Sequence, residues 1–296
     1  MTKSVRKAVI PAAGFGTRLL PATKSQPKEM LPIVDRPAVQ YVVDEAARAG
    51  LHDVLLVITS DKGALEDYFD RQPALERFLR DKGKQAELDE VLALSELAQV
   101  HSVRQSEPLG LGHAVLQARP HVGDESFAVL LPDDIIGPDE MLLPRMIEVH
   151  ERTGRAVVAV TRVPPEQAHL YGVVDVRPTS REDLHDVVDL IEKPSPDDAP
   201  SELAIIGRYV LPAEVFDDIE AAEPGRGGEI QLTDALRTLA AREPMVAIEF
   251  TGVRYDVGDK QGFLRATVAM AAERPDLGPD FLDWLVNFVR ARKEQG

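Results

Sequence analysis

A turn of small residues near the N-terminus has the composition of an anion-binding loop. Residues 11–18 read PAAGFGTR and follow the apolar run from Lys7 to Ile10. The backbone of such a turn can approach a ligand closely, and its exposed N–H groups form a concavity that attracts anions. Arg18, Lys24 and Lys28 follow along a proline-punctuated loop. Three cations that converge on a glycine turn suit a triphosphate.

This turn does not match two well-known phosphate-binding motifs. A dinucleotide-binding fingerprint would need a third glycine where the sequence has Leu19, and its acidic partner would be Asp35, which lies in a proline-bounded turn. A P-loop would need Gly-Lys-Ser/Thr after the second glycine, and this is also absent. A bare Gly-x-Gly more often marks an ordinary turn, so the cations that follow it are what favours a phosphate site.

Two adjacent carboxylates, Asp133 and Asp134, follow the apolar run from Phe127 to Leu131. One hard carboxylate together with phosphate oxygens and waters is the usual way in which proteins hold Mg²⁺ at a nucleotide. Adjacent residues of an extended chain point in opposite directions, so the role of Asp134 stays open. Without the preceding strand, an Asp-Asp pair would more often be a turn or a helix cap.

Composition limits the remaining chemistry. The chain has 296 residues, no cysteine and a formal net charge of -16. The missing cysteines exclude disulfides, thiolate zinc sites and cysteine nucleophiles, so oxygen or imidazole ligands must hold any metal. The negative charge argues against nucleic acid and anionic membranes as partners. Between Met1 and Met30, however, six Lys or Arg face a single Glu, and this basic stretch favours a small anion.

The hydrophobic content of 44% is enough to bury a sizeable core. The apolar runs are short, and the N-terminal sequence MTKSVRKAVIPAAG lacks the apolar stretch and the cleavage site of a signal peptide. We therefore expect a cytoplasmic protein.

The elements that would position these residues alternate along the chain. Short aliphatic runs, which are typical of buried strands, alternate with segments of helical period. The strand-like runs are residues 7–10, 54–59, 127–131 and 156–161, and the helical segments include 38–49 and 112–118. This alternation predicts an α/β fold with helices around a mostly parallel, doubly wound sheet, in which ligands bind at the carboxyl ends of the strands. Residues 65–97 form a charged, helix-rich insertion that we interpret as structural.

After Tyr171 the pattern changes to strand runs separated by Pro, Ser and Asp turns, at residues 172–177, 184–192 and 203–211. These runs predict an antiparallel layer added to the sheet. Near the C-terminus we expect a helix from Phe281 to Arg292, one face of which carries Phe281, Trp284, Leu285, Phe288 and Val289. We expect this apolar face to pack on the core, with a subunit interface as the second interpretation.

Pro11 to Pro37, PAAGFGTRLLPATKSQPKEMLPIVDRP, closely resembles the signature of bacterial UTP-glucose-1-phosphate uridylyltransferases, within the sugar-nucleotide pyrophosphorylase superfamily. The resemblance covers essentially the whole chain, because later motifs follow in the expected order. They are RQSEPLGLGHA (104–114), FAVLLPDD (127–134), YGVV (171–174), IEKP (191–194), GGEIQLTD (227–234) and YDVGD (255–259).

The resemblance implies a Rossmann-like nucleotidyltransferase fold with a mostly parallel mixed central sheet, flanking helices and an added antiparallel sugar-binding layer. It implies one nucleotidyltransferase domain at 1–274, with its nucleotide-binding part at about 1–160 and its sugar-binding part at about 161–260. Residues 275–296 would be a helical tail for packing or oligomerisation, since the family tends towards homodimers or homotetramers. The implied reaction joins UTP to glucose 1-phosphate by Mg²⁺-dependent in-line displacement at the α-phosphorus, giving UDP-glucose and pyrophosphate.

The resemblance also assigns roles to individual residues. The catalytic residues would be Arg18, Lys28, Asp133 and Lys193; the nucleotide-binding residues Ala12, Ala13, Gly14, Gly16, Thr17, Gln105 and Gly110; the sugar-phosphate-binding residues Gly172, Glu192 and Lys193; and the metal ligands Asp133 and Asp256. In this scheme Gln105 reads the uracil edge, which suits an amide because it is both donor and acceptor. Asp259 is an alternative ligand or a helix cap.

For the remaining polar residues of these motifs we expect supporting roles. We interpret His113 as structural, Glu229 and Gln231 as shaping the site, and Asp234 as favouring a helix N-terminus. Taken alone, a glutamine such as Gln105 more often lies on the surface, and Glu-Lys-Pro usually marks a solvated turn.

Three other functions are compatible with parts of the sequence. A thymidylyltransferase would act on the same sugar phosphate, and thymine differs from uracil by one methyl group, which a pocket discriminates by only about 1–3 kcal/mol. The form PKEMLP at residues 27–32 resembles the uridylyl branch. A non-catalytic sugar-nucleotide sensor would be marked by loss of a key lysine or carboxylate, and none is missing. A nicotinamide oxidoreductase is disfavoured by Leu19.

Overall fold

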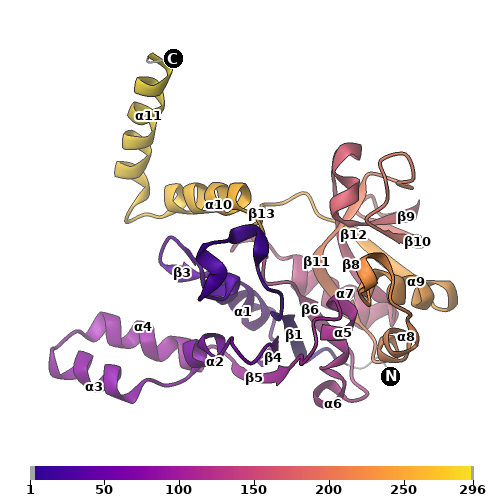
Figure 1. Ribbon diagram of the computed structural model, residues 1–296, viewed down its shortest axis with the longest axis horizontal. Coiled ribbons are helices and arrows are strands. Elements are labelled where there is room, and N and C mark those ends of the chain that lie inside the picture. Colours follow the sequence, from indigo (N-terminus) through magenta and orange to yellow (C-terminus); the bar gives the residue numbers. More distant parts are fainter. Residues whose placement is uncertain (1–3, 295–296) are drawn as a thin grey trace.

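The computed structural model describes residues 4–294, and its centre is a nine-stranded sheet (Figure 1). The strands lie in the order β5-β4-β1-β6-β11-β8-β12-β10-β9. Their bounds are β1 (Lys7–Pro11), β4 (Asp53–Ile58), β5 (Gln99–Arg104), β6 (Phe127–Leu130), β8 (Ala156–Arg162), β9 (Gly172–Pro178), β10 (Leu184–Glu192), β11 (Leu203–Leu211) and β12 (Met245–Glu249). Two small sheets stand beside it, β2 (Pro32–Ile33) with β3 (Arg36–Pro37) and β7 (Asp134–Ile136) with β13 (Arg254–Asp256).

Strand direction divides the central sheet. β5, β4, β1 and β6 run parallel, as do β8 and β12, whereas β11 is antiparallel to β6 and β8, its neighbours on either side. β10 and β9 continue the sheet as antiparallel strands. The α/β class and the antiparallel strands after Tyr171 are confirmed, and these strands extend the central sheet itself. Ala204 of β11 also pairs with Val173 of β9, so this end of the sheet curls back on itself.

Helices cover both faces of the sheet. Ala8 and Ile10 of β1 belong to the apolar cluster that includes α1 (Ala38–Arg48) and α7 (Leu142–Thr153). Val9 belongs to the opposite cluster, which includes α5 (Leu111–Leu116), α6 (Arg119–Val122), α8 (Val215–Ala221) and α9 (Leu232–Arg242). Successive side chains of a strand point to opposite faces, and here both faces are buried. This explains why the strand runs are continuously apolar.

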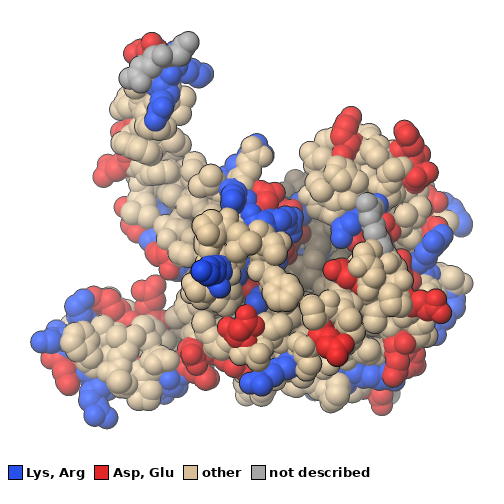
Figure 2. Space-filling view, viewed as in Figure 1, with Lys and Arg blue, Asp and Glu red and all other residues tan. Residues whose placement is uncertain are grey.

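Two helical arms project from this body (Figures 1 and 2). The insertion after β4 contains α2 (Ala64–Phe69), α3 (Pro73–Asp81) and α4 (Gln85–Glu96), of which α3 and α4 form the arm at the lower left. At the other end of the chain, α10 (Lys260–Glu273) leads into α11 (Gly278–Glu294), which stands away from the sheet. Within residues 4–294, no helix has both the length and the apolar character needed to cross a membrane.

The apolar face of α11 is exposed. The side chains of Trp284 and Phe288 are 55% and 43% exposed, and the rings of Phe281, Trp284 and Phe288 stack along the helix with centroid separations of 5.9 and 5.3 Å. The expectation that this face packs on the core is therefore wrong. Periodicity in a sequence shows that one face of a helix is apolar, but it does not show what covers that face.

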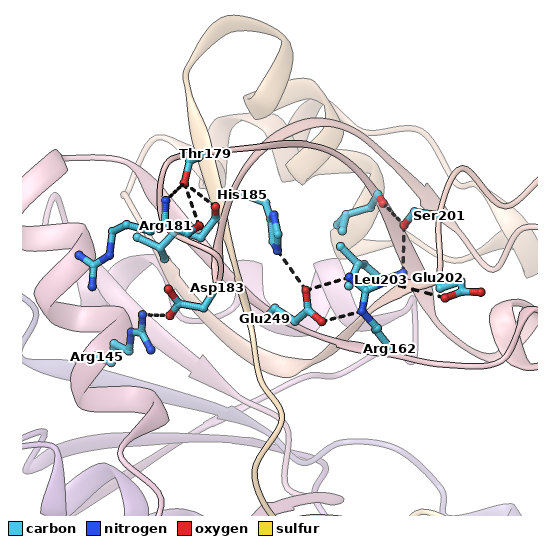
Figure 3. Close-up of polar contacts among 12 residues, drawn as sticks. Arg145, Arg162, Thr179, Arg181, Asp183, His185, Ser201, Glu202, Leu203 and Glu249 are labelled. Carbon is cyan, nitrogen blue, oxygen red and sulfur yellow. Dashed lines mark hydrogen bonds and ion pairs between the residues drawn. The ribbon is translucent and has the colours of Figure 1, made fainter.

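A polar cluster ties together three neighbouring strands at the curled end of the sheet (Figure 3). Glu249, at the end of β12, accepts a hydrogen bond from Arg162 Nε of β8 at 2.7 Å and lies 3.1 Å from His185 Nε2 of β10. Nearby, Arg145 of α7 forms an ion pair with Asp183, just before β10. These contacts fix β8, β10, β12 and α7 relative to one another.

Candidate active site

Two cavities meet at the edge of the sheet where β1 and β6 end. The first, of about 430 Å³, is lined by the glycine turn, and we call it the turn cavity. The second, of about 670 Å³, extends to the end of β10, and we call it the β10 cavity. The residues that line both are Leu111, Leu131, Asp133 and Glu229. Asp133 is therefore accessible from either side.

Most of the predicted nucleotide-binding residues line the turn cavity. They are Ala13, Gly14, Gly16, Thr17, Gln105 and Gly110, accompanied by Lys28 and Asp133. Ala12 is the exception because it is fully buried. Its N–H donates to the Val57 carbonyl at 2.7 Å, and its own carbonyl accepts from Lys62. Ala12 thus supports the turn from behind, with its N–H and one lone pair of its carbonyl oxygen engaged within the protein.

Lys62 stabilises the glycine turn without lining the turn cavity. Its Nζ donates to the carbonyl oxygens of Ala12 and Gly14, the latter at 2.8 Å, and to the Glu29 carboxylate at 2.9 Å. The side chains of Lys62 and Glu29 are only 6% and 0% exposed. Burial raises the pKa of Glu29, although the charges of Lys62 and Lys28 oppose this. Sequence reasoning missed Lys62, because a lone lysine just beyond the end of β4 carries no local sign of these partners.

Gln105 follows β5 and is 5% exposed in the wall of the turn cavity. Its Nε2 donates to the Gly110 carbonyl at 3.2 Å and lies 2.9 Å from Nδ1 of His113 on α5. Gly110 has a φ of 105°, and a Cβ there would lie 2.7 Å from the Ile230 carbonyl oxygen. Only glycine tolerates both constraints. Residue 110 therefore lets the segment around Ile230 close against the start of α5.

Lys28 and Asp133 are directly paired. Lys28 Nζ lies 2.6 Å from Asp133 Oδ2, and Arg18 Nη2 lies 4.0 Å from the same oxygen. Burial by itself would raise the pKa of Asp133, but the attraction of Lys28 and its hydrogen bond outweigh burial and hold that pKa below its usual range. Burial likewise acts to lower the pKa of Lys28, but Asp133 and Glu29 raise it overall. The third predicted cation, Lys24, is exposed and lines a separate hollow.

Arg208 of β11 holds the turn that carries Asp133. Its side chain is 0% exposed, and its guanidinium contacts the Glu45 carboxylate of α1 at 2.7 Å. The same guanidinium donates to the carbonyl oxygens of Leu131 at 3.1 Å and Asp134 at 2.6 Å. A buried guanidinium with partners on both sides of Asp133 fixes the backbone there.

Pairing of β7 with β13 brings the two acidic motifs together. Asp256 lies opposite Asp134 in this small sheet. A Cβ at Gly258 would lie 3.0 Å from Arg18 Nη2, 3.1 Å from Asp256 Oδ1 and 3.2 Å from Asp133 Oδ2, so these two carboxylates converge beside the Arg18 guanidinium. Asp134 instead accepts from Arg254 Nε at 2.6 Å.

The convergence of Asp133 and Asp256 fits a divalent cation, because two carboxylates supply hard oxygen donors. Within residues 4–294, no group of three or more His, Cys, Asp or Glu is arranged to hold a metal ion. Phosphate oxygens and water would have to complete the coordination, as is usual for Mg²⁺ at nucleotides. Asp259 has a different role: its side chain caps α10 by accepting from the N–H groups of Gln261 and Gly262.

The predicted sugar-phosphate residues meet in the β10 cavity. Gly172 of β9 is the register partner of Glu192 of β10, and both line the cavity with Lys193. Glu192 Oε2 accepts from Thr233 Oγ1 at 2.7 Å, and its Oε1 lies 3.1 Å from Lys193 Nζ. Thr233 and Arg254 were not predicted, although each adjoins a recognised motif residue. Arg254 adds a cation to this wall.

Of the predicted supporting residues, Glu229 and Gln231 line the β10 cavity, whereas Asp234 lines neither cavity. Glu229 lines both, and its Oε2 accepts from Gln231 Nε2 at 3.1 Å. Asp234 lies in the first turn of α9, where its charge favours the helix N-terminus.

The fold and the paired cavities are those of a nucleotide-transferring enzyme. The sequence model described as "Nucleotidyl transferase" matches residues 7–273, so the chain belongs to the nucleotidyl transferase family.

Within this family, the chain resembles uridylyltransferases of bacteria. It is 48% identical over 295 residues to the UTP-glucose-1-phosphate uridylyltransferase YngB of Bacillus subtilis, covering 100% of this chain and 99% of that protein. A UTP-bound UDP-glucose pyrophosphorylase from Acinetobacter baumannii superposes with a TM-score of 0.88 at 42% identity, covering 95% of this chain and 99% of that one. A UDP-glucose pyrophosphorylase complexed with UDP-glucose gives a TM-score of 0.83 at 40% identity, with 91% and 100% covered.

Proposed function

We propose that this protein joins UTP to glucose 1-phosphate, forming UDP-glucose and releasing pyrophosphate. The observation that carries the proposal is the position of Asp133, which lines both the turn cavity and the β10 cavity. A nucleotide in one cavity and a sugar phosphate in the other would meet at this carboxylate. The full-length similarity to a UTP-glucose-1-phosphate uridylyltransferase supports these two substrates.

The reaction is a direct in-line displacement. A phosphate oxygen of glucose 1-phosphate attacks the α-phosphorus of UTP, and the bond from that phosphorus to the oxygen bridging the β-phosphate breaks. Pyrophosphate leaves with the electron pair of that bond, and no protein nucleophile takes part. Catalysis then rests on positioning two polyanions and on stabilising their charge.

The named residues divide these tasks. Arg18 and Lys28 bind the triphosphate and stabilise the leaving pyrophosphate, while Lys193 offsets the charge of the attacking phosphate. Gln105, with the backbone of Ala13 and Gly14, recognises the uracil edge. In the β10 cavity, Gly172 and Glu192 contact glucose hydroxyls.

A divalent metal is generally used by nucleotidyltransferases of this family. We propose Mg²⁺, held by Asp133 and Asp256 together with phosphate oxygens and water. When bound, it would supply positive charge to the α-phosphate and the leaving group. The convergence of these two carboxylates near Gly258 supports this assignment.

The chain would be organised around the two substrates. We propose a nucleotide-binding part at about residues 1–160 and a sugar-binding part at about 161–260, followed by the tail from 275 to 296. The exposed aromatic face of α11 supports assembly into a homodimer or homotetramer. Light scattering of the wild type and of Trp284→Glu tests this. A monomeric wild type would refute the assembly, and an unchanged oligomer in Trp284→Glu would remove α11 from the interface.

Pyrophosphate release tests the proposed reaction. The protein is incubated with glucose 1-phosphate and Mg²⁺, and UTP is compared with dTTP, ATP, GTP and CTP, with a control lacking sugar phosphate for each. Strong preference for UTP, dependent on glucose 1-phosphate, is the expected result. Equal or better use of dTTP would reassign the protein as a thymidylyltransferase, and no release with any nucleotide would favour a sugar-nucleotide sensor.

A further inference from the structure

The carboxamide of Gln105 has one polar atom left for a ligand. Its Nε2 is engaged twice, by the Gly110 carbonyl at 3.2 Å and by His113 Nδ1 at 2.9 Å. An amide nitrogen has two hydrogens, so these two partners use both. Among the parts of residues 4–294 that the structure describes, no donor forms a hydrogen bond with Oε1 of Gln105, and the residue lines the turn cavity. The cavity therefore presents an acceptor at this position.

The neighbouring backbone determines which way the amide points. Amide nitrogen and oxygen are usually assigned from their hydrogen-bond partners. Gly110 contributes a carbonyl oxygen, which can only accept. If the Gln105 amide were turned over, two oxygens would face each other at about the same separation. The nitrogen therefore belongs beside Gly110, and Nδ1 of His113 must be the acceptor for its second hydrogen.

This arrangement also fixes the protonation of His113. Because Nδ1 accepts, the neutral ring carries its proton on Nε2. That nitrogen lies 3.1 Å from Nε2 of Gln117, one turn further along the helical segment, and Gln117 Nε2 also donates to the His113 carbonyl at 3.2 Å. With the proton on Nε2 of His113, the half-buried Gln117 amide turns its oxygen to that proton and gives up the bond to the His113 carbonyl. His113 is thus held between two glutamines, one in the cavity wall and one outside it.

We propose that His113 sets base specificity by holding Gln105 with its oxygen towards the turn cavity. His113 itself does not line the cavity, so it acts as a positioning residue. The inference rests on the proposed function in one respect, namely that the turn cavity binds the base of a nucleoside triphosphate.

The acceptor selects one class of base. Uracil and thymine carry an N–H at ring position 3, which would donate to Oε1 of Gln105. Cytosine has an unprotonated nitrogen at that position, so two acceptors would face each other. Loss of His113 removes one of the two acceptors that hold the amide nitrogen, so the amide turns over more readily and presents its NH₂ group, which matches cytosine. The contact therefore distinguishes uracil and thymine from cytosine by the proton on the nitrogen at ring position 3. It does not detect the methyl group that distinguishes thymine from uracil.

Substitutions of similar size separate this role from simple packing. His113→Leu removes the acceptor but fills the space, whereas His113→Asn keeps an oxygen near the position of Nδ1. His113→Ala provides a second apolar variant if His113→Leu does not fold. His121→Leu is the control, because His121 contacts Asp53 at 2.7 Å and lines neither cavity. For each variant, kcat and KM are measured with UTP and with CTP, and binding of both nucleotides is measured by titration calorimetry.

We expect His113→Leu to lower the ratio of kcat/KM for UTP to that for CTP by about tenfold, the effect of losing one orienting hydrogen bond. The loss should fall on KM for UTP, while KM for glucose 1-phosphate stays unchanged. His113→Asn should keep most of the wild-type ratio, and His121→Leu all of it. A wild-type ratio in His113→Leu, or an equal loss in the Leu and Asn variants, would overturn the inference.

The same data distinguish this inference from the proposed reaction. If the wild type uses dTTP as well as UTP, the uridylyltransferase assignment fails. Thymine has the same ring N–H as uracil, so the ratio of kcat/KM for dTTP to that for CTP still tests the role of His113. If no nucleotide is turned over, the calorimetric ratio of UTP to CTP binding gives the answer without catalysis.

Discussion

Lys28 Nζ and Asp133 Oδ2 lie 2.6 Å apart at the junction of the turn cavity and the β10 cavity. The proposed phosphate-binding lysine and the proposed metal ligand thus neutralise each other when no ligand is bound. In the proposed reaction, the triphosphate takes Lys28 as its partner and the metal takes Asp133. Nucleotide and metal binding are therefore expected to favour each other. A triphosphate that binds Lys28 frees Asp133 for the metal, and a metal that binds Asp133 frees Lys28 for the triphosphate.

Replacing Lys28 by Met should raise the pKa of Asp133. Burial favours the protonated carboxyl, and the attraction of Lys28 is the main effect that now holds this pKa below its usual range. The ionised carboxylate of Asp133 stabilises the folded state at pH values above its unfolded pKa of about 3.9. This stabilisation is lost as the pH falls through the lower pKa of the folded state. In Lys28→Met, the pH below which Mg²⁺ binding is lost should therefore move upward. Metal titrations over a pH series measure this, with the exposed Lys84→Met as control; an unchanged pH would contradict it.

Asp133→Asn and Asp134→Asn should fail in different ways. Asp133→Asn removes a charged ligand and should lower kcat by about 100-fold or more while the protein stays folded. Asp134→Asn leaves Arg254, whose side chain is 16% exposed, without its close ion pair and with only the more distant carboxylate of Asp256 at 3.9 Å. Breaking such a pair costs about 3–5 kcal/mol of unfolding free energy. Steady-state kinetics and urea unfolding of both variants test this contrast, and a near wild-type kcat for Asp133→Asn would exclude Asp133 as the metal ligand.

Lys193→Met should chiefly raise KM for glucose 1-phosphate. Lys193 lines the β10 cavity beside Glu192, and its ammonium is a point charge suited to a phosphate dianion. Losing one charge-assisted hydrogen bond weakens binding by about 10–100-fold. KM for UTP should change little, because the turn cavity does not contain this side chain. If both KM values rise equally, or neither changes, the sugar phosphate binds elsewhere.

The sequence predicted those parts of the fold that depend on local pattern. The runs at residues 184–192 and 203–211 form β10 and β11 with the predicted bounds, because buried strands are continuously apolar. The position of β11 between β6 and β8 was not predictable in this way, since strand order depends on contacts between distant segments. The exposure of the apolar face of α11 was likewise not predictable, since it depends on whether another segment covers that face.

The candidate site shows the same division. Asp133 could be proposed from its place after an apolar strand, and Lys193 could be proposed only from the resemblance of its motif to the family, since Glu-Lys-Pro alone usually marks a solvated turn. Lys62 and Arg208 could not, because their importance comes from partners far along the chain, Glu29 and Glu45, that only the folded structure brings within hydrogen-bonding distance. A lone charged residue in a strand or loop carries no local sign of such a partner.

Lys62→Met should destabilise the protein and weaken UTP binding, and a double variant should separate the two effects. The single change leaves Glu29 buried without its ammonium partner, which costs about 3–5 kcal/mol. In Lys62→Met/Glu29→Met no buried charge is left unpaired, so most of the unfolding free energy should return. The carbonyls of Ala12 and Gly14 still lack their donor in this variant, so the glycine turn stays loose and KM for UTP stays high. Urea unfolding and steady-state kinetics of both variants measure the two effects, and recovery of KM together with stability would mean that Lys62 serves the fold and not the turn.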